Sequence, residues 1–231
     1  LVTGSTSGIG LGIAKALAQQ GANIVLNGFG DHAGPEADIA ALGAKVAYHG
    51  ADMSKPAEIE DMIAFADAGI TTFDCADIYT GVEELIGAFR SEYGNRRGAE
   101  ALAQIKVHTK LVPDLEALPT VNRTYIRNIV ETSATRLRMQ QLDLVQFHWW
   151  DYAVPRYLEA IGWLEELRRE GKVAQIGGTN FDTDRTLEIM KSGVPLLSMQ
   201  VQYSLLDARP ERHLVQLAQQ HNIWLLCYGT V

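Results

Sequence analysis

The sequence predicts an α/β protein whose strands run parallel and are joined by helices. Short apolar runs rich in β-branched residues recur along the 231 residues, and segments with apolar positions at helical spacing lie between several of them. The intervals are long enough for a crossover helix, which parallel strands require. The composition, with 47% hydrophobic and 21% charged residues, is typical of a globular protein.

Nine runs are expected to form strands. They are residues 1–3, 23–27, 45–49, 71–74, 105–109, 142–148, 172–177, 198–203 and 223–228. Between them, residues 122–138 repeat apolar side chains at spacings of three and four, which predicts a helix with one buried face. Residues 155–170 begin with Pro155, which suits the first turn of a helix, and stop before Gly171. Asp182 is expected to cap a helix that runs to Gly193.

Charge and cysteine content restrict the partners and the compartment. The net charge of −8 argues against nucleic acid or an anionic membrane, and no apolar run reaches the roughly 18 residues that a membrane span needs. Two cysteines, Cys75 and Cys227, make no disulfide framework, and Cys75 is expected to be a small core thiol. We therefore expect a cytoplasmic protein that acts on a small molecule. Its oligomeric state stays open.

The residue composition changes near residue 66. Residues 1–66 contain no arginine, no tryptophan and 10 of the 21 glycines, whereas residues 67–231 contain 13 arginines and all four tryptophans. This change predicts two parts of different origin, 1–66 and 67–231.

The first part opens with a glycine-rich turn between a strand and a helix. Gly4, Gly8 and Gly10 would let a pyrophosphate approach the backbone N–H groups at the start of the helix, where a side chain would block it. The alternative is a glycine-rich turn of any α/β protein. The pattern Thr3-Gly4-x-x-x-Gly8-x-Gly10 resembles the short-chain dehydrogenases/reductases, in particular bacterial 3-hydroxybutyrate dehydrogenases, over residues 1–66.

This resemblance implies a Rossmann-like βαβαβα segment in which Gly4, Ser7, Gly8, Ile9 and Gly10 line the pyrophosphate. It also implies that Phe29 and Asp52 flank the adenosine, with NAD favoured over NADP because no basic residue follows the second strand. The family's catalytic serine and its Tyr-x-x-x-Lys pair are absent after residue 66. The chemistry of that family therefore cannot run on this chain, and the first part can at most bind.

The second part carries several motifs in one order: Asp-Ala-Gly-Ile-Thr-Thr-Phe-Asp-Cys-Ala-Asp-Ile-Tyr (67–79), His-Thr-Lys-Leu (108–111), Leu-Asp-Leu-Val-Gln-Phe-His-Trp (142–149), Gly-Gly-Thr-Asn-Phe (177–181), Met-Gln-Val-Gln-Tyr (199–203) and Leu-Leu-Cys-Tyr (225–228). They resemble the aldo-keto reductases, which are TIM-like (β/α)8 barrels. The resemblance implies a catalytic tetrad of Asp74, Tyr79, Lys110 and His148. It also implies NADP or NAD as cofactor, with the nicotinamide contacted by Thr179, Asn180, Gln200 and Tyr228, and either Trp149 or Trp150 at the substrate mouth.

The tetrad residues also suit carbonyl reduction chemically. Asp74, Lys110 and His148 lie at the carboxyl ends of apolar runs, where parallel barrels carry their chemistry. A phenol is a poor acid at neutral pH unless a neighbouring cation stabilises its anion. Lys110 can supply that charge, Asp74 can orient Lys110, and His148 can donate to the carbonyl oxygen. Singly, these residues are as well explained by a helix cap, a solvated lysine and a core histidine.

The motifs correspond to strands two to seven of the barrel, so its first and last strands are missing. The predicted fold is therefore a hybrid or incomplete TIM-like barrel. In the hybrid, residues 45–49 replace the lost first strand and residues 23–27 the lost last strand; the rival is a small separate sheet beside an incomplete barrel. We expect an NAD(P)-dependent oxidoreductase that reduces an aldehyde or ketone, impaired by the missing elements. The alternatives are a non-catalytic dinucleotide-binding module and an inactive recombined scaffold.

Overall fold

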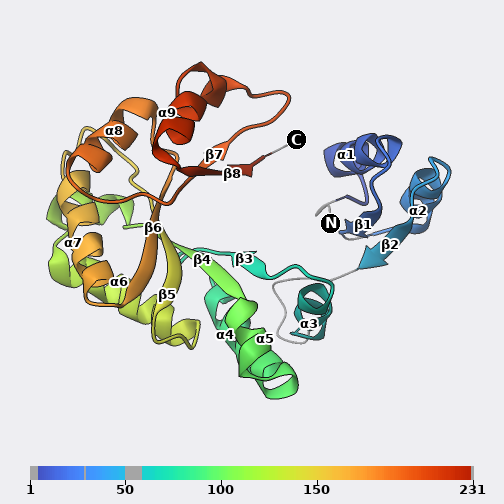
Figure 1. The fold of residues 1–231 in the computed structure, drawn as a ribbon, viewed down its shortest axis with the longest axis horizontal. Helices are drawn as coiled ribbons and strands as arrows, with labels where there is room; N and C mark the ends of the chain where they lie inside the picture. The colour runs from blue at the N-terminus through green and yellow to red at the C-terminus, as the bar shows by residue number, and fades with distance from the viewer. Residues whose placement is uncertain (1–4, 29, 50–58, 230–231) are drawn as a thin grey trace. The chain divides into compact units, whose positions relative to one another are not determined.

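A computed structural model describes residues 5–28, 30–49 and 59–229 (Figure 1). The predicted strand at residues 1–3 lies outside the described residues, as do Gly4, Phe29 and Asp52. By its internal contacts the chain divides into two compact units, Leu1–Asp61 and Met62–Thr230. The division falls inside helix α3 (Ile59–Asp67), as does the change in composition at residue 66.

Among its described residues, the first unit has two strands and two helices in alternation before the start of α3. These are α1 (Gly8–Gln19), β1 (Ile24–Asn27), α2 (Ala33–Ala40) and β2 (Val46–His49). The two strands pair in parallel, with Ile24 opposite Val46. A small core of Ala14, Ala18, Ile24, Leu26 and Ile39 joins the helices to the strands. A full Rossmann-like segment stays a prediction, because its first strand is not among the described residues.

The second unit is a curled sheet of six parallel strands in the order β3-β4-β5-β6-β7-β8. The strands are β3 (Thr72–Asp74), β4 (Lys106–Leu111), β5 (Leu142–Phe147), β6 (Val173–Thr179), β7 (Ser198–Gln202) and β8 (Trp224–Tyr228). The connections are α4 (Val82–Arg97), α5 (Ala99–Gln104), η2 (Leu115–Thr120), α6 (Arg123–Arg136), α7 (Tyr157–Arg169), α8 (Thr183–Lys191), η3 (Arg209–Arg212) and α9 (Leu214–His221).

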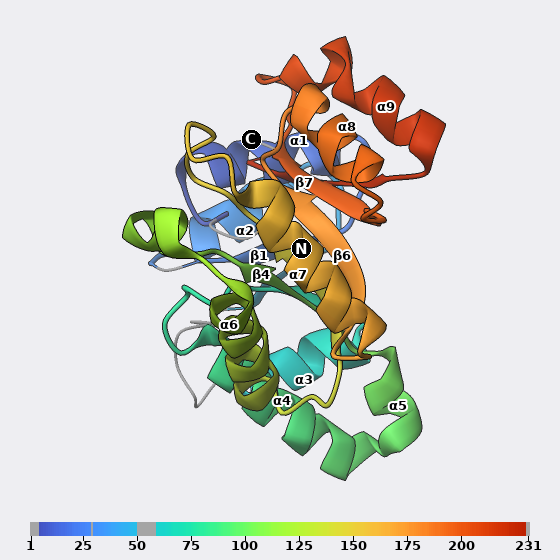
Figure 2. The same ribbon diagram turned by 90° about the vertical axis from the view of Figure 1, so that its left-hand side faces the viewer.

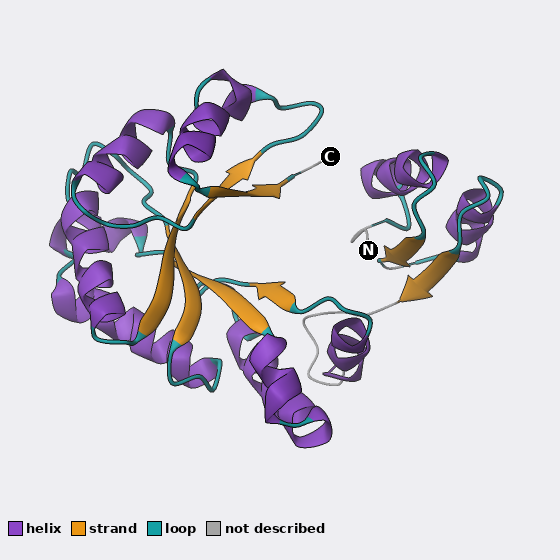
Figure 3. Ribbon diagram, in the orientation of Figure 1, coloured by secondary structure: helices purple, strands orange, loops and turns teal. Residues whose placement is uncertain are grey.

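The helices of the second unit cover the convex side of its sheet (Figure 3). Figure 2 faces this side and shows α7 lying across β6, with which it is in contact. Apolar side chains fill the layer between sheet and helices; for example, the Phe73 ring of β3 lies 4.9 Å from the Phe89 ring of α4. Helices on the outside leave the inner side and the strand ends to carry polar groups.

The six strands of the second unit form an incomplete barrel, and the hybrid barrel, in which β1 and β2 would complete it, stays a prediction. Among the described residues, β1 and β2 pair only with each other, and the six strands of the second unit form a separate sheet. Equal strand spacing and handedness made the hybrid possible in principle. They did not determine which strands share a hydrogen-bond ladder.

Local signals placed the helices well. The Asp182 carboxylate accepts a hydrogen bond from the Arg185 N–H at 2.9 Å and caps α8, which ends at Lys191 rather than at Gly193. Helix α7 begins at Tyr157, so Pro155 lies before the helix and not in its first turn. The helix predicted over residues 122–138 is α6, with the Asn122 side chain capping it.

A buried carboxylate ties two of the outer helices to β4. Glu83 of α4 is fully buried; its carboxylate accepts from the Thr109 hydroxyl at 2.6 Å and from the Arg136 guanidinium at 3.3 Å. Thr109 therefore points toward the helices. Its neighbour Lys110 points to the inner side of the sheet, as strand alternation requires. This contact fixes the register in which β4 presents its functional residue.

Within the described part of the chain, none of the helices is both long enough and apolar enough to cross a membrane.

The close crossing of α4 and α6 depends on a glycine. A Cβ at Gly87 would lie 2.1 Å from the Arg136 carbonyl oxygen, which belongs to backbone and cannot move aside. We predict that Gly87→Ala lowers the free energy of unfolding by about 1–3 kcal/mol through overpacking.

The matched control is Gly162→Ala in α7, where a Cβ meets nothing within 4 Å. This change should raise the free energy of unfolding by up to about 1 kcal/mol, because alanine favours a helix more than glycine does. Urea denaturation monitored by circular dichroism measures both. Equal effects of the two substitutions would contradict the packing described for α4 and α6.

Candidate functional site

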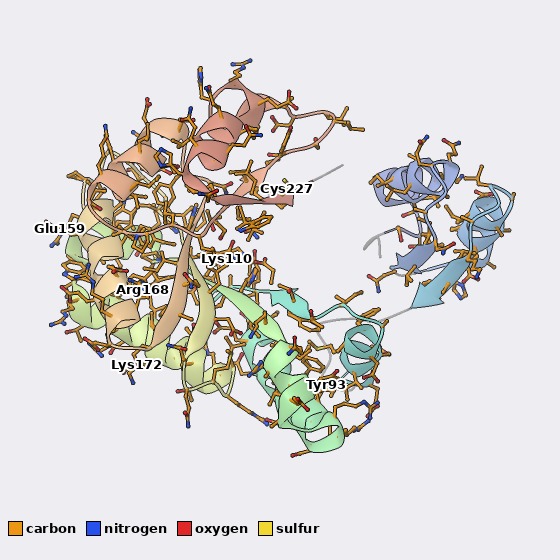
Figure 4. All side chains as sticks on the ribbon, in the orientation of Figure 1. Tyr93, Lys110, Glu159, Arg168, Lys172 and Cys227 are labelled. Atoms are coloured by element: carbon orange, nitrogen blue, oxygen red, sulfur yellow. The ribbon has the colours of Figure 1, made fainter. Side chains whose placement is uncertain are left out.

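The strand ends on the inner side of the curled sheet enclose a cavity of about 370 Å3. All eight residues predicted for the tetrad and the nicotinamide line this cavity, although they come from six strands or the segments that directly follow them. The lining is Asp74, Ala76, Ile78, Tyr79, Lys110, Val112, His148, Trp150, Thr179, Asn180, Gln200 and Tyr228. Figure 4 shows Lys110 on the inner side of the sheet, while Glu159, Arg168 and Lys172 belong to the helical exterior.

Lys110 is a buried cation held by two acceptors. Its ammonium donates to the Asp74 Oδ2 at 2.6 Å and to the Cys75 carbonyl oxygen at 2.8 Å, and the residue is 6% exposed. A buried ammonium is costly unless it is paired and hydrogen-bonded, and both conditions are met here. Cys75 itself is a buried free thiol, as expected, and burial raises its pKa to about 12.

Tyr79 stands on the segment between β3 and α4, with 47% of its surface exposed. The Lys110 ammonium lies 5.5 Å from the centroid of its ring. Tyr79 and Lys110 thus line the same cavity, with the ammonium near the tyrosine ring.

His148 follows β5 and is half-buried. Its Nδ1 lies 3.2 Å from the Thr179 carbonyl oxygen, which can only accept, so Nδ1 carries the proton. In the neutral ring the other nitrogen, Nε2, is then an acceptor. Burial lowers the pKa of His148 below its usual value of 6.5, so the ring is mainly neutral at pH 7. Donation from Nε2 consequently requires the protonated ring.

A second group of polar side chains lines the cavity from β6, β7 and β8. The Tyr228 hydroxyl donates to the Asn180 Oδ1 at 2.8 Å, which leaves the Asn180 amide N–H groups directed elsewhere. Asn180 has a left-handed backbone (φ 60°), a conformation that asparagine tolerates better than most residues. The Thr179 hydroxyl oxygen is buried and has no hydrogen-bond partner among the described residues.

Asp74 accepts two further hydrogen bonds on its other oxygen. The Gln146 amide donates to Oδ1 at 2.7 Å, and the Gln200 amide donates to the same atom at 3.1 Å. Sequence reasoning missed Gln146. The available signal was an amide in the otherwise apolar second half of the run Leu-Asp-Leu-Val-Gln-Phe, since a buried polar group needs a partner.

Of the two tryptophans proposed for the mouth, Trp150 lines the cavity and Trp149 does not. Trp149 is 1% exposed and belongs to the core, whereas Trp150 is 50% exposed. The Trp150 indole N–H donates to the Pro113 carbonyl oxygen at 2.9 Å, and its ring meets the His148 ring edge-on at 4.6 Å. Ile78 and Val112, which were not singled out, complete the apolar side of the cavity.

A larger cavity, of about 590 Å3, lies on the other side of Ile78 and Val112 and includes Asp77 and Arg136. Burial raises the pKa of Asp77 to about 7. Val112 donates its N–H to this carboxyl at 3.2 Å. None of the predicted site residues lines this cavity.

The glycine-rich loop is described only in part. Ser7 precedes α1 with an extended backbone and no side-chain cap, and Gly8 opens the helix with φ 53°. Gly10 and Ile9 fall within the first turn of α1 rather than before it. The first-turn N–H groups of a helix are free to bind an anion. Which of these residues contact a pyrophosphate stays a prediction.

Comparison with known proteins separates the two parts of the chain. The profile of the KR domain matches residues 1–72, and that of the Aldo/keto reductase family matches residues 41–231. The first part is similar to the D-beta-hydroxybutyrate dehydrogenase of Cupriavidus necator, at 65% identity over 80 residues, which is 34% of this chain and 30% of that protein. The two profiles overlap on the segment that contains α3.

The second part is similar to the aldo-keto reductase YhdN of Bacillus subtilis, at 32% identity over 178 residues; this covers 75% of the chain and 51% of that protein. A solved thermostable aldo-keto reductase, Tm1743, matches with a TM-score of 0.65 and 26% identity over 79% of this chain and 64% of that one. The chain thus spans about half the length of YhdN and about a third of the dehydrogenase. It belongs to the aldo/keto reductase family and carries an N-terminal segment of short-chain dehydrogenase type.

Proposed function

We propose that the chain is an NAD(P)H-dependent carbonyl reductase in which Tyr79 gives a proton to the oxygen of an aldehyde or ketone. The observation that carries the proposal is the ion pair of the buried Lys110 with the solvent-exposed Asp74, beside an exposed Tyr79 and a half-buried His148 in one cavity. Family membership supports the same reaction class. The substrate within that class and the choice between NADH and NADPH stay open.

The polar group from β6 to β8 fits a nicotinamide. A carboxamide has a carbonyl acceptor and an N–H2 donor, and the unpartnered Thr179 hydroxyl, the Asn180 amide and the Gln200 amide offer both kinds of partner. The Tyr228 ring, held by its bond to Asn180, adds a flat apolar surface. When bound, a reduced nicotinamide supplies the hydride to the carbonyl carbon.

The side chains of the protein donate a proton to the carbonyl oxygen and stabilise the negative charge that this leaves on the donor. The phenol of Tyr79 transfers its proton to that oxygen, and the Lys110 ammonium stabilises the phenolate that remains. Asp74 and the Cys75 carbonyl keep the ammonium in place before any substrate arrives. This arrangement needs no rearrangement of the charged groups during the reaction, which is the source of its catalytic effect.

His148 has a role that depends on protonation. Its Nδ1 proton is used by the Thr179 carbonyl, so only the imidazolium can donate from Nε2 to the substrate oxygen. The ring is held by this contact and by the edge of Trp150. We infer that His148 orients the carbonyl more strongly in mildly acidic solution.

A second candidate function is dinucleotide binding at the start of α1 without turnover. The observation that favours it is Gly8, which opens α1 in a left-handed conformation after the uncapped Ser7. The N–H groups at this end of the helix would hold a pyrophosphate.

The first prediction concerns Tyr79. Tyr79→Phe removes the hydroxyl and keeps the ring, so oxidation of NADPH or NADH with a generic aldehyde should slow at least about a hundredfold, as expected for loss of general acid catalysis. The decrease in cofactor absorbance measures the rate.

The matched control is Tyr203→Phe, which removes a phenol hydroxyl that donates to Glu211 and does not line the cavity. This variant should retain the wild-type rate. Equal rates for Tyr79→Phe and the wild type would end the proposal for Tyr79.

The second prediction concerns pH. The value of kcat/KM should rise as pH falls through the pKa of His148, which burial holds below 6.5, because the protonated ring donates to the carbonyl oxygen. His148→Gln, whose amide donates at every pH, should remove this dependence. A profile for His148→Gln that rises as steeply as the wild type would show that another group titrates.

The third prediction separates the two binding modes. Quenching of tryptophan fluorescence by added NADPH or NADH should be weakened about tenfold or more by Tyr228→Ala if the nicotinamide binds the cavity, since the flat surface for its ring is lost. Gly8→Val should instead abolish binding if the start of α1 is the anchor, because valine resists a φ of 53° and covers the N–H groups. Loss of binding in Gly8→Val alone would favour the binding module.

A further inference from the structure

We propose that Gln146 is a positioning residue that orients Asp74, and through Asp74 the Lys110 ammonium, for proton release by Tyr79. The inference rests on the proposed function and extends it to a residue outside the tetrad. Gln146 lies on β5, which pairs with β4 on one side and with β6 on the other. Its partners in the sheet are Lys110 of β4 and Gly177 of β6.

The hydrogen bond from Gln146 to Asp74 is short, and its donor, Gln146, is fully buried. The Gln146 amide nitrogen lies 2.7 Å from the Asp74 Oδ1, and Gln146 is 0% exposed. The Asp74 Oδ2 lies 2.6 Å from the Lys110 ammonium. The two oxygens of the carboxylate are thus each held by a donor from a different strand, which fixes its rotation about the side-chain bond. A hydrogen bond to an ionised group is stronger than one between neutral groups.

Gln200 also donates to the Asp74 Oδ1, at 3.1 Å, but it lines the cavity and Gln146 does not. A cavity residue is available to a ligand, and the proposed function assigns the Gln200 amide to the nicotinamide carboxamide. When that contact forms, Gln146 is the donor that stays with Asp74 Oδ1. Asp74 therefore keeps its orientation in the state in which the reaction occurs.

Packing alone does not account for a glutamine at this position. Its Oε1 is buried and has no hydrogen-bond partner among the described residues. A methionine or leucine would fill a similar volume without leaving an unsatisfied oxygen, which is unfavourable in a protein interior. The amide N–H on Asp74 is the contact that only glutamine supplies.

The sheet places Gln146 between two neighbouring strands, opposite Lys110 on one side and Gly177 on the other. A Cβ at Gly177 would lie 2.4 Å from the Ser198 Oγ, so the glycine allows β6 and β7 to approach closely there; the same Cβ would lie at an ordinary contact distance of 3.4 Å from the Gln146 Cγ.

The first test uses Gln146→Met, with Gln175→Met as the matched control. Gln175 is an exposed glutamine of β6, two residues before Gly177, and it does not line the cavity. We expect Gln146→Met to lower kcat about tenfold, the effect of losing one hydrogen bond to a charged group, with KM changed less than about twofold. Its melting temperature should not fall, because an unsatisfied oxygen is removed. An unchanged kcat, or a loss of activity that only follows a loss of stability, would overturn the inference.

The second test is Gln146→Glu, which is nearly isosteric and donates to Asp74 only while its carboxyl is protonated. The charged or titratable groups near this position include Asp74 of β3, Lys110 and His108 of β4, and His148 after β5; its described neighbours on β6 and β7, Gly177, Ser198 and Gln200, are neutral. The ratio of variant to wild-type kcat should rise as pH falls, because protonation of the introduced carboxyl restores the hydrogen bond to Asp74. The ratio is used because the titration of His148 and of other groups shared by both proteins cancels in it. A ratio independent of pH would overturn the inference.

A third measurement does not depend on turnover. The crystal structure of Gln146→Met with an oxidised nicotinamide cofactor bound, the state in which the Gln200 amide contacts the carboxamide, should show the Asp74 carboxylate rotated, with its Oδ2 moved away from the Lys110 ammonium. An unchanged contact would overturn the positioning role even if the chain proves to have no activity. If instead Tyr79→Phe matches the wild type while the carboxylate rotates, the proposed reaction fails and the positioning contact stands.

Discussion

The site depends on one ion pair between neighbouring strands, in which the lysine is buried and the aspartate is exposed. Lys110 is 6% exposed, and its ammonium would be unstable in the sheet without Asp74 and the Cys75 carbonyl oxygen. Parallel pairing of β3 with β4 brings the two strand ends to the same edge, and the Glu83 contact with Thr109 fixes the face on which Lys110 emerges. Tyr79 and His148 line the same cavity as this ion pair, so the Lys110 ammonium lies at a fixed place near both side chains. Six strands of a barrel are sufficient to form it.

The chain also shows how two α/β proteins can join. The KR and Aldo/keto reductase profiles overlap between residues 41 and 72, where helix α3 leads into β3. A crossover helix has the same task in both folds, since it packs its apolar face on a parallel sheet and delivers the chain to the next strand. Met62, Ile63 and Ala66 form that buried face here. In the described residues, the strands before α3 and the strands after it nevertheless belong to two different sheets.

Much of the fold and most of the site could be predicted from the sequence. Asp74, Tyr79, Lys110 and His148 line one cavity because motifs at the ends of parallel strands converge at one edge. The pairing of β1 with β2 alone could not be predicted, since counting strands does not give hydrogen-bond partners. Gln146 was missed because its contact with Asp74 depends on how the Asp74 side chain is rotated. The tautomer of His148 could not be predicted because its partner, the Thr179 carbonyl, is a backbone group that leaves no signal in the sequence.

We propose that hydride transfer to a carbonyl carbon in this half-barrel is controlled by the Lys110 charge. The most direct measurement uses a reduced nicotinamide cofactor with deuterium at C4, an aldehyde substrate, and mass spectrometry of the alcohol formed. We expect deuterium on the carbinol carbon with the wild-type chain, and at least about a hundredfold less label with Lys110→Met, which removes the ammonium and keeps the aliphatic stem. Alcohol without deuterium, or equal label from both proteins, would contradict it.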